Sequence, residues 1–168
     1  FFDYKLANID LITEAQLQGV LRFGGRWVTE LGLPEQFPSV VTPDTYLQNM
    51  QRFCDFAVAR NQQTWIQIPV FMDNTDIGQI LDAIEDRPDQ CNLLLFAIGN
   101  EVDRFDHEEE SYAKSYTWPD YLAHLERIVP VLRERFPDTP RVALDLSSFE
   151  DYWNYTAVRE WVDPFCAS

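Results

Sequence analysis

The sequence is poor in lysine, histidine and cysteine, and it contains no long hydrophobic run. Its 168 residues include 13 Lys plus Arg against 28 Asp plus Glu, which gives a formal net charge of −15. A field of this sign repels phosphate groups, so neither nucleic-acid binding nor docking on an anionic membrane is expected. No apolar segment approaches the roughly 18 residues of a transmembrane helix, so membrane insertion is not expected either. The expected partners are neutral or lightly charged molecules.

The three cysteines, Cys54, Cys91 and Cys166, lack the paired spacing of a metal site. Their odd number allows one internal disulfide at most, and their positions do not decide which two form it. No nucleotide fingerprint is present, and His107 with its acidic neighbours matches no established zinc or calcium spacing. We therefore expect no cofactor and no metal. Residues 154–156 form an N-glycosylation sequon, which matters only in a protein secreted from a eukaryotic cell. A secreted or extracytoplasmic location is expected.

Short apolar runs alternate with stretches of helical periodicity along the chain. The apolar runs are expected to be strands, and they cover residues 20–23, 65–71, 93–98 and 142–146. Apolar residues recur at the spacing of an amphipathic helix in residues 43–60, 76–85, 119–136 and 150–162. This alternation predicts an α/β protein with βα units and parallel strands, arranged in a single domain that spans residues 1–168.

The chemistry of a parallel α/β protein is expected where its strands end, because loops there surround a cavity floored by the sheet. The run 93–98 is the most hydrophobic of the four and is soon followed by Asn100 and Glu101. A carboxylic acid at this position is expected to be partly desolvated, which would raise its pKa and let it act as a general acid near neutral pH. Glu101 is therefore the leading catalytic candidate, with a structural ion pair to Arg22 or Arg104 as the alternative.

Two segments carry a resemblance to a known family. They are Leu21-Arg22-Phe23-Gly24-Gly25 and, later in the chain, Phe96-Ala97-Ile98-Gly99-Asn100-Glu101-Val102-Asp103. Together they are most similar to the heparanase and β-glucuronidase family, glycoside hydrolase family 79. This family belongs to clan A, whose members are retaining hydrolases built on a (β/α)8 barrel. The resemblance covers roughly residues 10–150. It implies a partial (β/α)8 TIM barrel of about four βα units, equivalent to strands two to five of the barrel.

The resemblance also implies roles for single residues. Glu101 would protonate the glycosidic oxygen and later activate water, while Asn100 would hold the 2-hydroxyl of the sugar. Arg22, Gly24 and Gly25 would shape the floor of the sugar site.

The sequence departs from the family's usual pattern at Val102, where proline is usual, and at Arg26, where a small polar residue is usual. Trp27 and Trp118 are candidates for stacking on a sugar, because a flat apolar ring face matches the C–H face of a pyranose. Further candidates for contacting the substrate are Arg26, Asp73, Asn74, Asp103 and Asp145. Trp65 is assigned instead to the core, at the far end of its strand, and His124 to the surface.

Retaining hydrolysis needs a second carboxyl group about 5 to 5.5 Å from the acid. In the family's barrels that nucleophile ends the seventh strand, and no residue of this sequence takes its place. We therefore expect a glycosidase fragment that does not hydrolyse glycosides alone. Its expected partners are a neutral or lightly charged glycan and the remainder of the barrel, or another chain, covering the exposed sheet edges.

Two other functions fit the same sequence. One is a non-catalytic carbohydrate-binding or structural surface protein that keeps the barrel fold. The other is a half-barrel that completes itself as a homodimer. A carboxylate close to Glu101 would favour the enzyme, whereas a hydrophobic or basic residue there would favour the binding protein.

Overall fold

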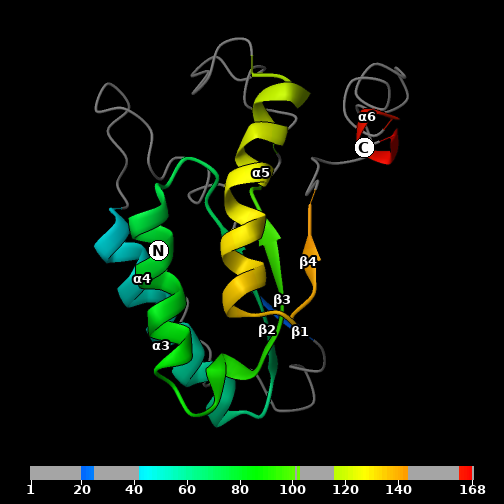
Figure 1. Cartoon of the computed structure of the whole chain (residues 1–168). Helices are drawn as coiled ribbons and strands as arrows, with labels where there is room; N and C mark the ends of the chain where they lie inside the picture. The colour runs from blue at the N-terminus through cyan, green and yellow to red at the C-terminus, as the bar shows by residue number, and fades with distance from the viewer. Residues whose placement is uncertain (1–19, 25–41, 101, 103–115, 144–162, 168) are drawn as a thin grey trace, which may run out of the picture.

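The structure is a computed structural model that describes residues 20–24, 42–100, 102, 116–143 and 163–167. Within these residues, four parallel strands form one sheet in the order β1-β2-β3-β4, and they are Val20–Phe23, Gln63–Ile68, Leu93–Ile98 and Arg141–Val142. Helices α3 (Pro43–Ala59), α4 (Asn74–Glu85) and α5 (Trp118–Arg135) connect successive strands, as Figure 1 shows. A short 3-10 turn, η3 (Gln90–Asn92), precedes β3, and α6 (Asp163–Ala167) is the last described element. The predicted α/β class with a parallel sheet is confirmed.

The predicted elements agree with the observed ones except near β2 and β4. The apolar run 65–71 was expected to be a strand throughout, but β2 covers Gln63–Ile68. It ends before Pro69 because proline has no N–H to donate to a neighbouring strand. Residues 144–146 of the last expected strand, and the expected helix 150–162, lie outside the described residues.

Side-chain caps fix where the three connecting helices begin. The hydroxyl of Thr42 accepts a hydrogen bond from the Thr45 N–H at 3.2 Å, and Pro43 occupies the first turn of α3. The carboxylate of Asp73 accepts from the Asp76 N–H at 2.9 Å at the start of α4. Thr117 and Asp120 form a capping box at the start of α5. These caps set the point at which each chain segment turns away from the C-terminal end of the sheet.

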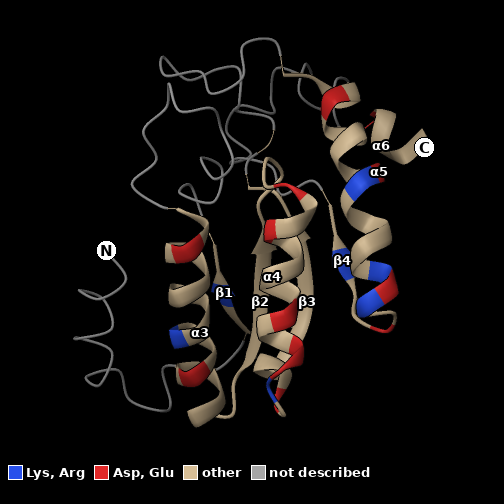
Figure 2. Ribbon diagram, turned by 60° about the vertical axis from the view of Figure 1, so that its left-hand side comes forward, with Lys and Arg blue, Asp and Glu red and all other residues tan. Residues whose placement is uncertain are grey.

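Helices α3, α4 and α5 pack on the same face of the sheet, as Figures 1 and 2 show from two directions. Alternate strand residues point to this face and are fully buried against the helices. They include Phe23, Ile66, Ile68, Phe96 and Ile98. Buried tyrosine hydroxyls join the helices to the sheet: Tyr46 of α3 donates to the Gln67 carbonyl, and Tyr121 of α5 donates to the Ile98 carbonyl at 2.7 Å.

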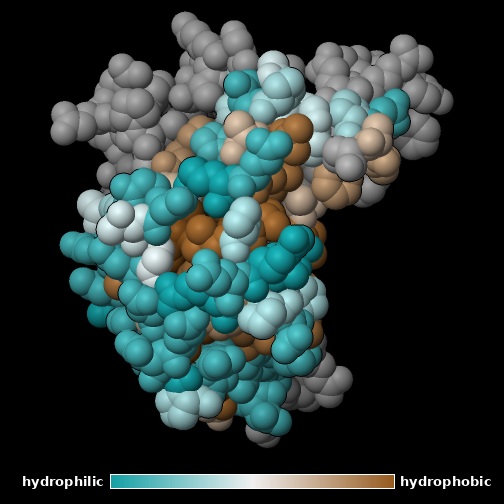
Figure 3. Space-filling model, in the orientation of Figure 1, coloured by the Kyte–Doolittle hydropathy of each residue, from teal (hydrophilic) through white to brown (hydrophobic). Residues whose placement is uncertain are grey.

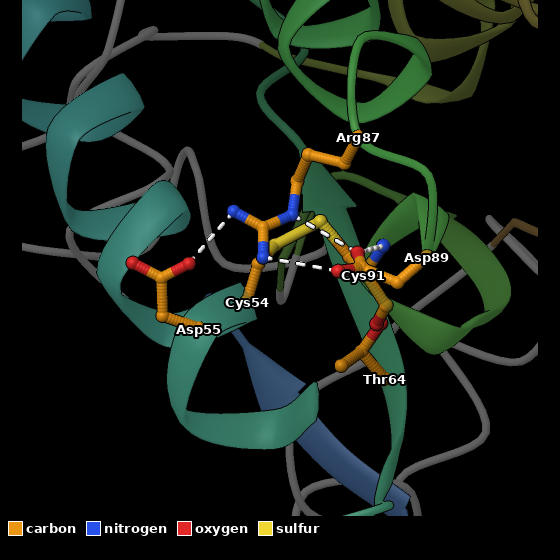
Figure 4. Close-up of a disulfide and its surroundings, with 6 residues drawn as sticks. All are labelled: Cys54, Asp55, Thr64, Arg87, Asp89 and Cys91. Atoms are coloured by element: carbon orange, nitrogen blue, oxygen red, sulfur yellow. Dashed lines mark hydrogen bonds and ion pairs between the residues drawn. A yellow bond between two sulfur atoms is a disulfide. The ribbon is translucent and has the colours of Figure 1, made fainter. Parts of the chain in front are cut away.

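A disulfide joins Cys54 of α3 to Cys91 of η3, and both residues are fully buried (Figure 4). Thr64 of β2 donates its hydroxyl to the Cys91 carbonyl at 2.9 Å. Arg87 lies beside the bridge and pairs with Asp55 at 2.8 Å and with Asp89 at 3.0 Å. The bridge therefore fixes the end of the sheet opposite to the strand C-termini. Cys166, the third cysteine, is exposed and free.

The outer surface of the helices is mostly hydrophilic, with hydrophobic side chains visible between the helices in Figure 3. Acidic residues are spread along α3 and α4 in Figure 2, whereas basic residues gather in the last turn of α5. There Arg135 bonds Glu85 and Asp82 of α4. Among the described helices, none has the length and apolar character needed to cross a membrane.

Candidate functional site

The strand register brings a group of polar side chains together on the face of the sheet away from the helices. Arg22 of β1 lies opposite Trp65 of β2, which lies opposite Leu95 of β3. Two residues further along β2, Gln67 lies opposite Ala97. Because side chains alternate between the two faces of a strand, Arg22, Trp65 and Gln67 point away from the core formed by Phe23, Ile66 and Ile68. These neighbouring strands therefore form one surface that leads to their C-terminal ends.

Arg22 connects this surface to the end of β3. Its Nη2 donates to Oδ1 of Asn100 at 2.7 Å, and its guanidinium carbon lies 5.0 Å from the centroid of the Trp65 ring. A guanidinium at this position over an indole face is a favourable cation–π contact. Asn100 is only 4% exposed, whereas Arg22 is exposed. Arg22 thus places a positive charge at a strand end of a strongly acidic protein.

Gln67 is a fully buried polar residue at the same strand ends. Its Nε2 donates to the Gly99 carbonyl at 3.1 Å and lies 3.4 Å from Oδ1 of Asn100. Buried amides are found where hydrogen bonds compensate for the loss of water. The Asn100 carboxamide oxygen is therefore bonded from two neighbouring strands, and we call Arg22, Gln67 and Asn100 the strand-end network.

Two glycines make the close approach within this network possible. A Cβ atom added to Gly24 would lie 1.8 Å from Oε1 of Gln67, and Gly24 has a φ of +151°. A Cβ atom added to Gly99 would lie 2.6 Å from Cγ1 of Val102, and Gly99 has a φ of +81°. At both positions a Cβ atom would be too close to a neighbouring side chain, and the positive φ is one that residues with a Cβ rarely adopt. Val102, which stands where the resembled family usually has proline, is itself fully buried.

A second polar cluster lies where the chain leaves β2 and meets α5. Arg127 donates to the Val70 carbonyl at 2.7 Å and to Oδ1 of Asn74 at 2.9 Å. The ring of His124 stacks on the ring of Tyr116, with 6.0 Å between the ring centroids. It packs edge-to-face with the ring of Phe71, whose centroid is 5.4 Å away.

Burial dominates the electrostatics of this second cluster. Burial and then the charge of Arg127 lower the pKa of His124, against the opposing effect of Asp120. Burial also raises the pKa of Tyr116 well above its usual range. His124 was expected at the surface. That prediction is wrong, because the ring is half-buried among aromatic side chains.

The predicted site residues fall into three groups. The structure brings Arg22, Gly24 and Asn100 together. It places Asp73, Asn74 and Trp118 in structural contacts: Asp73 caps α4, Asn74 accepts from Arg127, and Trp118 packs against Tyr121 and Phe165. The remaining predicted residues lie outside the described ones, and they are Gly25, Arg26, Trp27, Glu101, Asp103 and Asp145.

Sequence reasoning missed two members of this surface. Trp65 was assigned to the core at the far end of its strand, but it is half-buried beside Arg22, because β2 begins two residues earlier than expected. Gln67 was not singled out. Its signal in the sequence is a lone polar side chain within the apolar run 65–71, at the same alternation as Trp65.

In the described part of the chain, no group of three or more His, Cys, Asp or Glu side chains is placed to hold a metal ion. The strand-end network contains one guanidinium and two carboxamides, which are hydrogen-bonding groups rather than typical metal ligands. Groups of this kind can bind a polar ligand through hydrogen bonds. No protein-family model matches this sequence, and no curated protein matches it significantly.

Proposed function

We propose that the C-terminal ends of β1, β2 and β3 form the acid/base side of a retaining glycoside hydrolase site, with Glu101 as the general acid/base. The observation that carries the proposal is the held position of Asn100, the residue directly before Glu101. Its Oδ1 accepts from Arg22 at 2.7 Å, and the side chain is almost fully buried. A carboxamide fixed in this way, on the residue before the proposed acid in the chain, is suited to hold a sugar hydroxyl in a defined position.

The arrangement of the elements supports a partial (β/α)8 barrel. The strand order follows the chain, and α3, α4 and α5 cover one face of the sheet. Doubly wound sheets reverse their strand order and carry helices on both faces, whereas a barrel keeps its helices outside. On this proposal, the surface with Arg22, Trp65 and Gln67 belongs to the inner side of the barrel, where its ligands bind.

In the proposed reaction, the second carboxylate bonds to the anomeric carbon as Glu101 donates its proton to the departing glycosidic oxygen, which leaves a glycosyl-enzyme. Glu101 then takes a proton from the water that attacks the anomeric carbon and releases both the sugar and the second carboxylate. The second carboxylate, needed about 5 to 5.5 Å away, comes from the remainder of the barrel. That part is also the proposed partner for β1 and β4, the edge strands of the described sheet. The proposed substrate is a neutral or lightly charged glycan, because the net charge of −15 disfavours a sulfated one.

Binding and turnover of aryl glycosides test this proposal. Wild type and Glu101→Gln are titrated with p-nitrophenyl β-D-glucoside and p-nitrophenyl β-D-glucuronide, and released nitrophenol is followed separately. Both proteins are expected to bind a glycoside, and neither is expected to release nitrophenol. Absence of binding would contradict the proposal. Turnover that is lost in Glu101→Gln would support the hydrolase. It would refute the proposal that the second carboxylate comes from the remainder of the barrel.

The second candidate function is a non-catalytic carbohydrate-binding protein, and the strand-end network favours it in one respect. Arg22 and Gln67 both direct donors at the Asn100 carboxamide oxygen, and these three side chains include no carboxylate. The pKa of the Glu101 carboxyl, measured by NMR titration, separates the two functions. An acid catalyst requires a value raised above the ordinary value of about 4.3, whereas a binding protein does not. The homodimeric half-barrel is tested by sedimentation, which would show a dimer.

We also propose an oxidising, extracytoplasmic location. The support is the Cys54–Cys91 bridge, since buried structural disulfides persist mainly in secreted and extracytoplasmic proteins. Expression in parallel in a reducing and an oxidising compartment tests this. Folded protein is expected in good yield from the oxidising compartment, and equal yield and stability from both would contradict it.

A further inference from the structure

We propose that the Cys54–Cys91 bridge is a redox-sensitive clamp on the chain segment that leads into β3. With the bridge closed, residues 90–92 form a left-handed turn, and reduction of the bridge lets this turn relax to ordinary negative φ angles. The clamp gives the bridge a conformational role in addition to the cross-link between α3 and η3. This inference goes beyond the proposed function and does not rest on a ligand at the strand ends.

The turn before β3 has a costly backbone conformation. Gln90, Cys91 and Asn92 have φ angles of +44°, +58° and +48°, and none of them is glycine. A left-handed conformation lowers the population of a residue that carries a Cβ by a factor of about 5 to 30, and it normally occurs at single residues. Asparagine tolerates it best, so the cost falls mainly on Gln90 and Cys91. Such a conformation persists only where its surroundings impose it.

Cys91, the middle residue of the turn, is fixed at three points (Figure 4). Its N–H donates to Oδ1 of Asp89 at 2.8 Å, and its carbonyl accepts from the Thr64 hydroxyl at 2.9 Å. Its sulfur is bonded to Cys54 of α3. The backbone and the side chain of Cys91 are therefore held from three directions.

The bridge is the strongest of these three attachments. A hydrogen bond typically changes an equilibrium by a factor of about five, which is no more than the cost of one left-handed residue. Asp89 is itself held by Arg87, which also pairs with Asp55 of α3, but the Asp55 side chain is 69% exposed. An exposed ion pair of this kind contributes little. The hydrogen bonds thus offset only part of the cost of the turn, and the covalent bond supplies the rest.

The reaction that opens the clamp is thiol–disulfide exchange with a dithiol reductant. A thiolate of the reductant attacks one sulfur of the bridge, and the second thiol of the reductant then resolves the mixed disulfide. Two electrons and two protons pass to Cys54 and Cys91, which become thiols, while the reductant becomes a disulfide. Relaxation of the turn favours this reaction, because only the closed form has to keep the left-handed conformation.

The turn leads directly into an irregular part of the sheet. Thr64 of β2 pairs with Leu93, but Trp65 pairs with Leu95, so β3 contains one residue more than β2 at this point. The hydroxyl of the same Thr64 bonds the Cys91 carbonyl. The clamp therefore acts on the way in which β3 begins.

The test measures the equilibrium between the bridge and its two thiols in mixtures of reduced and oxidised dithiothreitol. All proteins carry Cys166→Ser, so that alkylation and mass spectrometry count only Cys54 and Cys91. Gln90→Gly removes the cost of the left-handed backbone at an exposed residue, and Gln90→Val raises it because valine is β-branched. Asn61→Gly is the matched control, because Asn61 is also exposed, has a φ of +52° and lies outside the turn.

The expected shifts differ between the turn and the control. Gln90→Gly is expected to shift the equilibrium toward the bridge by about 5- to 30-fold, and Gln90→Val is expected to shift it toward the thiols. Asn61→Gly is expected to leave it unchanged, because that residue keeps its conformation in both states. An unchanged equilibrium in Gln90→Gly would overturn the proposal. An equal shift in Asn61→Gly would also overturn it, since reduction would then unfold the chain as a whole.

NMR tests the release of the turn without a substitution in it. The amide and α protons of one residue lie closer together at positive φ than at negative φ, so the NOE between them is stronger. Strong NOEs of this kind are expected for Gln90 and Asn92 in the oxidised protein and weaker ones after reduction, whereas Asn61 is expected to keep its strong NOE. Equally strong NOEs at Gln90 and Asn92 in the reduced protein would refute the clamp.

Discussion

The guanidinium of Arg22 donates to the carboxamide oxygen of Asn100 at 2.7 Å, although the two residues are 78 positions apart in the chain. The contact joins the end of β1 to the end of β3 across β2, whose Trp65 lies under the guanidinium. Three parallel strands are thereby joined at the edge where α/β proteins bind their ligands. The described strand ends therefore carry a group of polar side chains that are joined by hydrogen bonds.

Gly24→Ala is expected to destabilise the protein by about 2 kcal/mol or more, because the new Cβ meets buried atoms and the backbone conformation is strained. The Cβ would lie 1.8 Å from Oε1 of Gln67 at a φ of +151°. Urea unfolding measures the change. Gly78→Ala is the matched control: nothing lies within 4 Å of a Cβ there, within α4. This control is expected to stabilise the protein by about 0.5 to 1 kcal/mol. Equal effects of the two changes would contradict the packing at Gly24.

Loss of the Cys54–Cys91 bridge is expected to lower the free energy of unfolding by about 4 kcal/mol, from the entropy of a loop of this length. The two residues are 37 positions apart. The double variant Cys54→Ser with Cys91→Ser, measured by urea unfolding, gives the change. Cys166→Ser is the control, because that cysteine is free and exposed. A double variant as stable as Cys166→Ser would show that the bridge does not form.

His124 is expected to make the stability fall as the pH falls below about 6.5, the ordinary pKa of histidine. Burial and Arg127 lower its pKa in the folded protein, so the unfolded chain binds the proton more readily. The contribution is therefore fully present above the unfolded pKa and is lost as the pH falls through the folded one. Melting curves between about pH 5 and 8 for wild type and His124→Gln measure it. The variant is expected to show a flatter dependence, and identical slopes would contradict the assignment.

The strands and helices that could be predicted were those with a strong local signal. They include the unbroken apolar run Leu93–Ile98 and the amphipathic helices α3 and α5. Their hydrophobic patterns indicate a strand or a helix without knowledge of contacts with distant segments. Arg22 and Asn100 were found because parallel strands bring their C-terminal ends together. Asp73 carried a different signal, an acidic side chain three residues before Asp76 at a helix start, and its carboxylate caps α4.

The features that could not be predicted depend on contacts between distant segments. Which cysteines pair is decided by the distance between α3 and η3. His124 contacts Phe71 and Tyr116, which are brought to it by the packing of α5 on the end of β2. The position of the buried Gln67 side chain depends on the carbonyl of Gly99 and on the space at Gly24. Neither glycine is near Gln67 in sequence.

The most direct test of the proposed sugar site is an NMR titration of wild type and Asn100→Asp with p-nitrophenyl β-D-glucoside. An aspartate keeps the partner of Arg22, so the variant is expected to fold with an unchanged unfolding midpoint, but it lacks the Nδ2 donor. Saturable shifts are expected at Asn100, Gly99 and Gly24 in the wild type, with affinity at least about tenfold weaker in the variant. Equal affinity of the two proteins, or shifts confined to residues away from these strand ends, would contradict the proposed site.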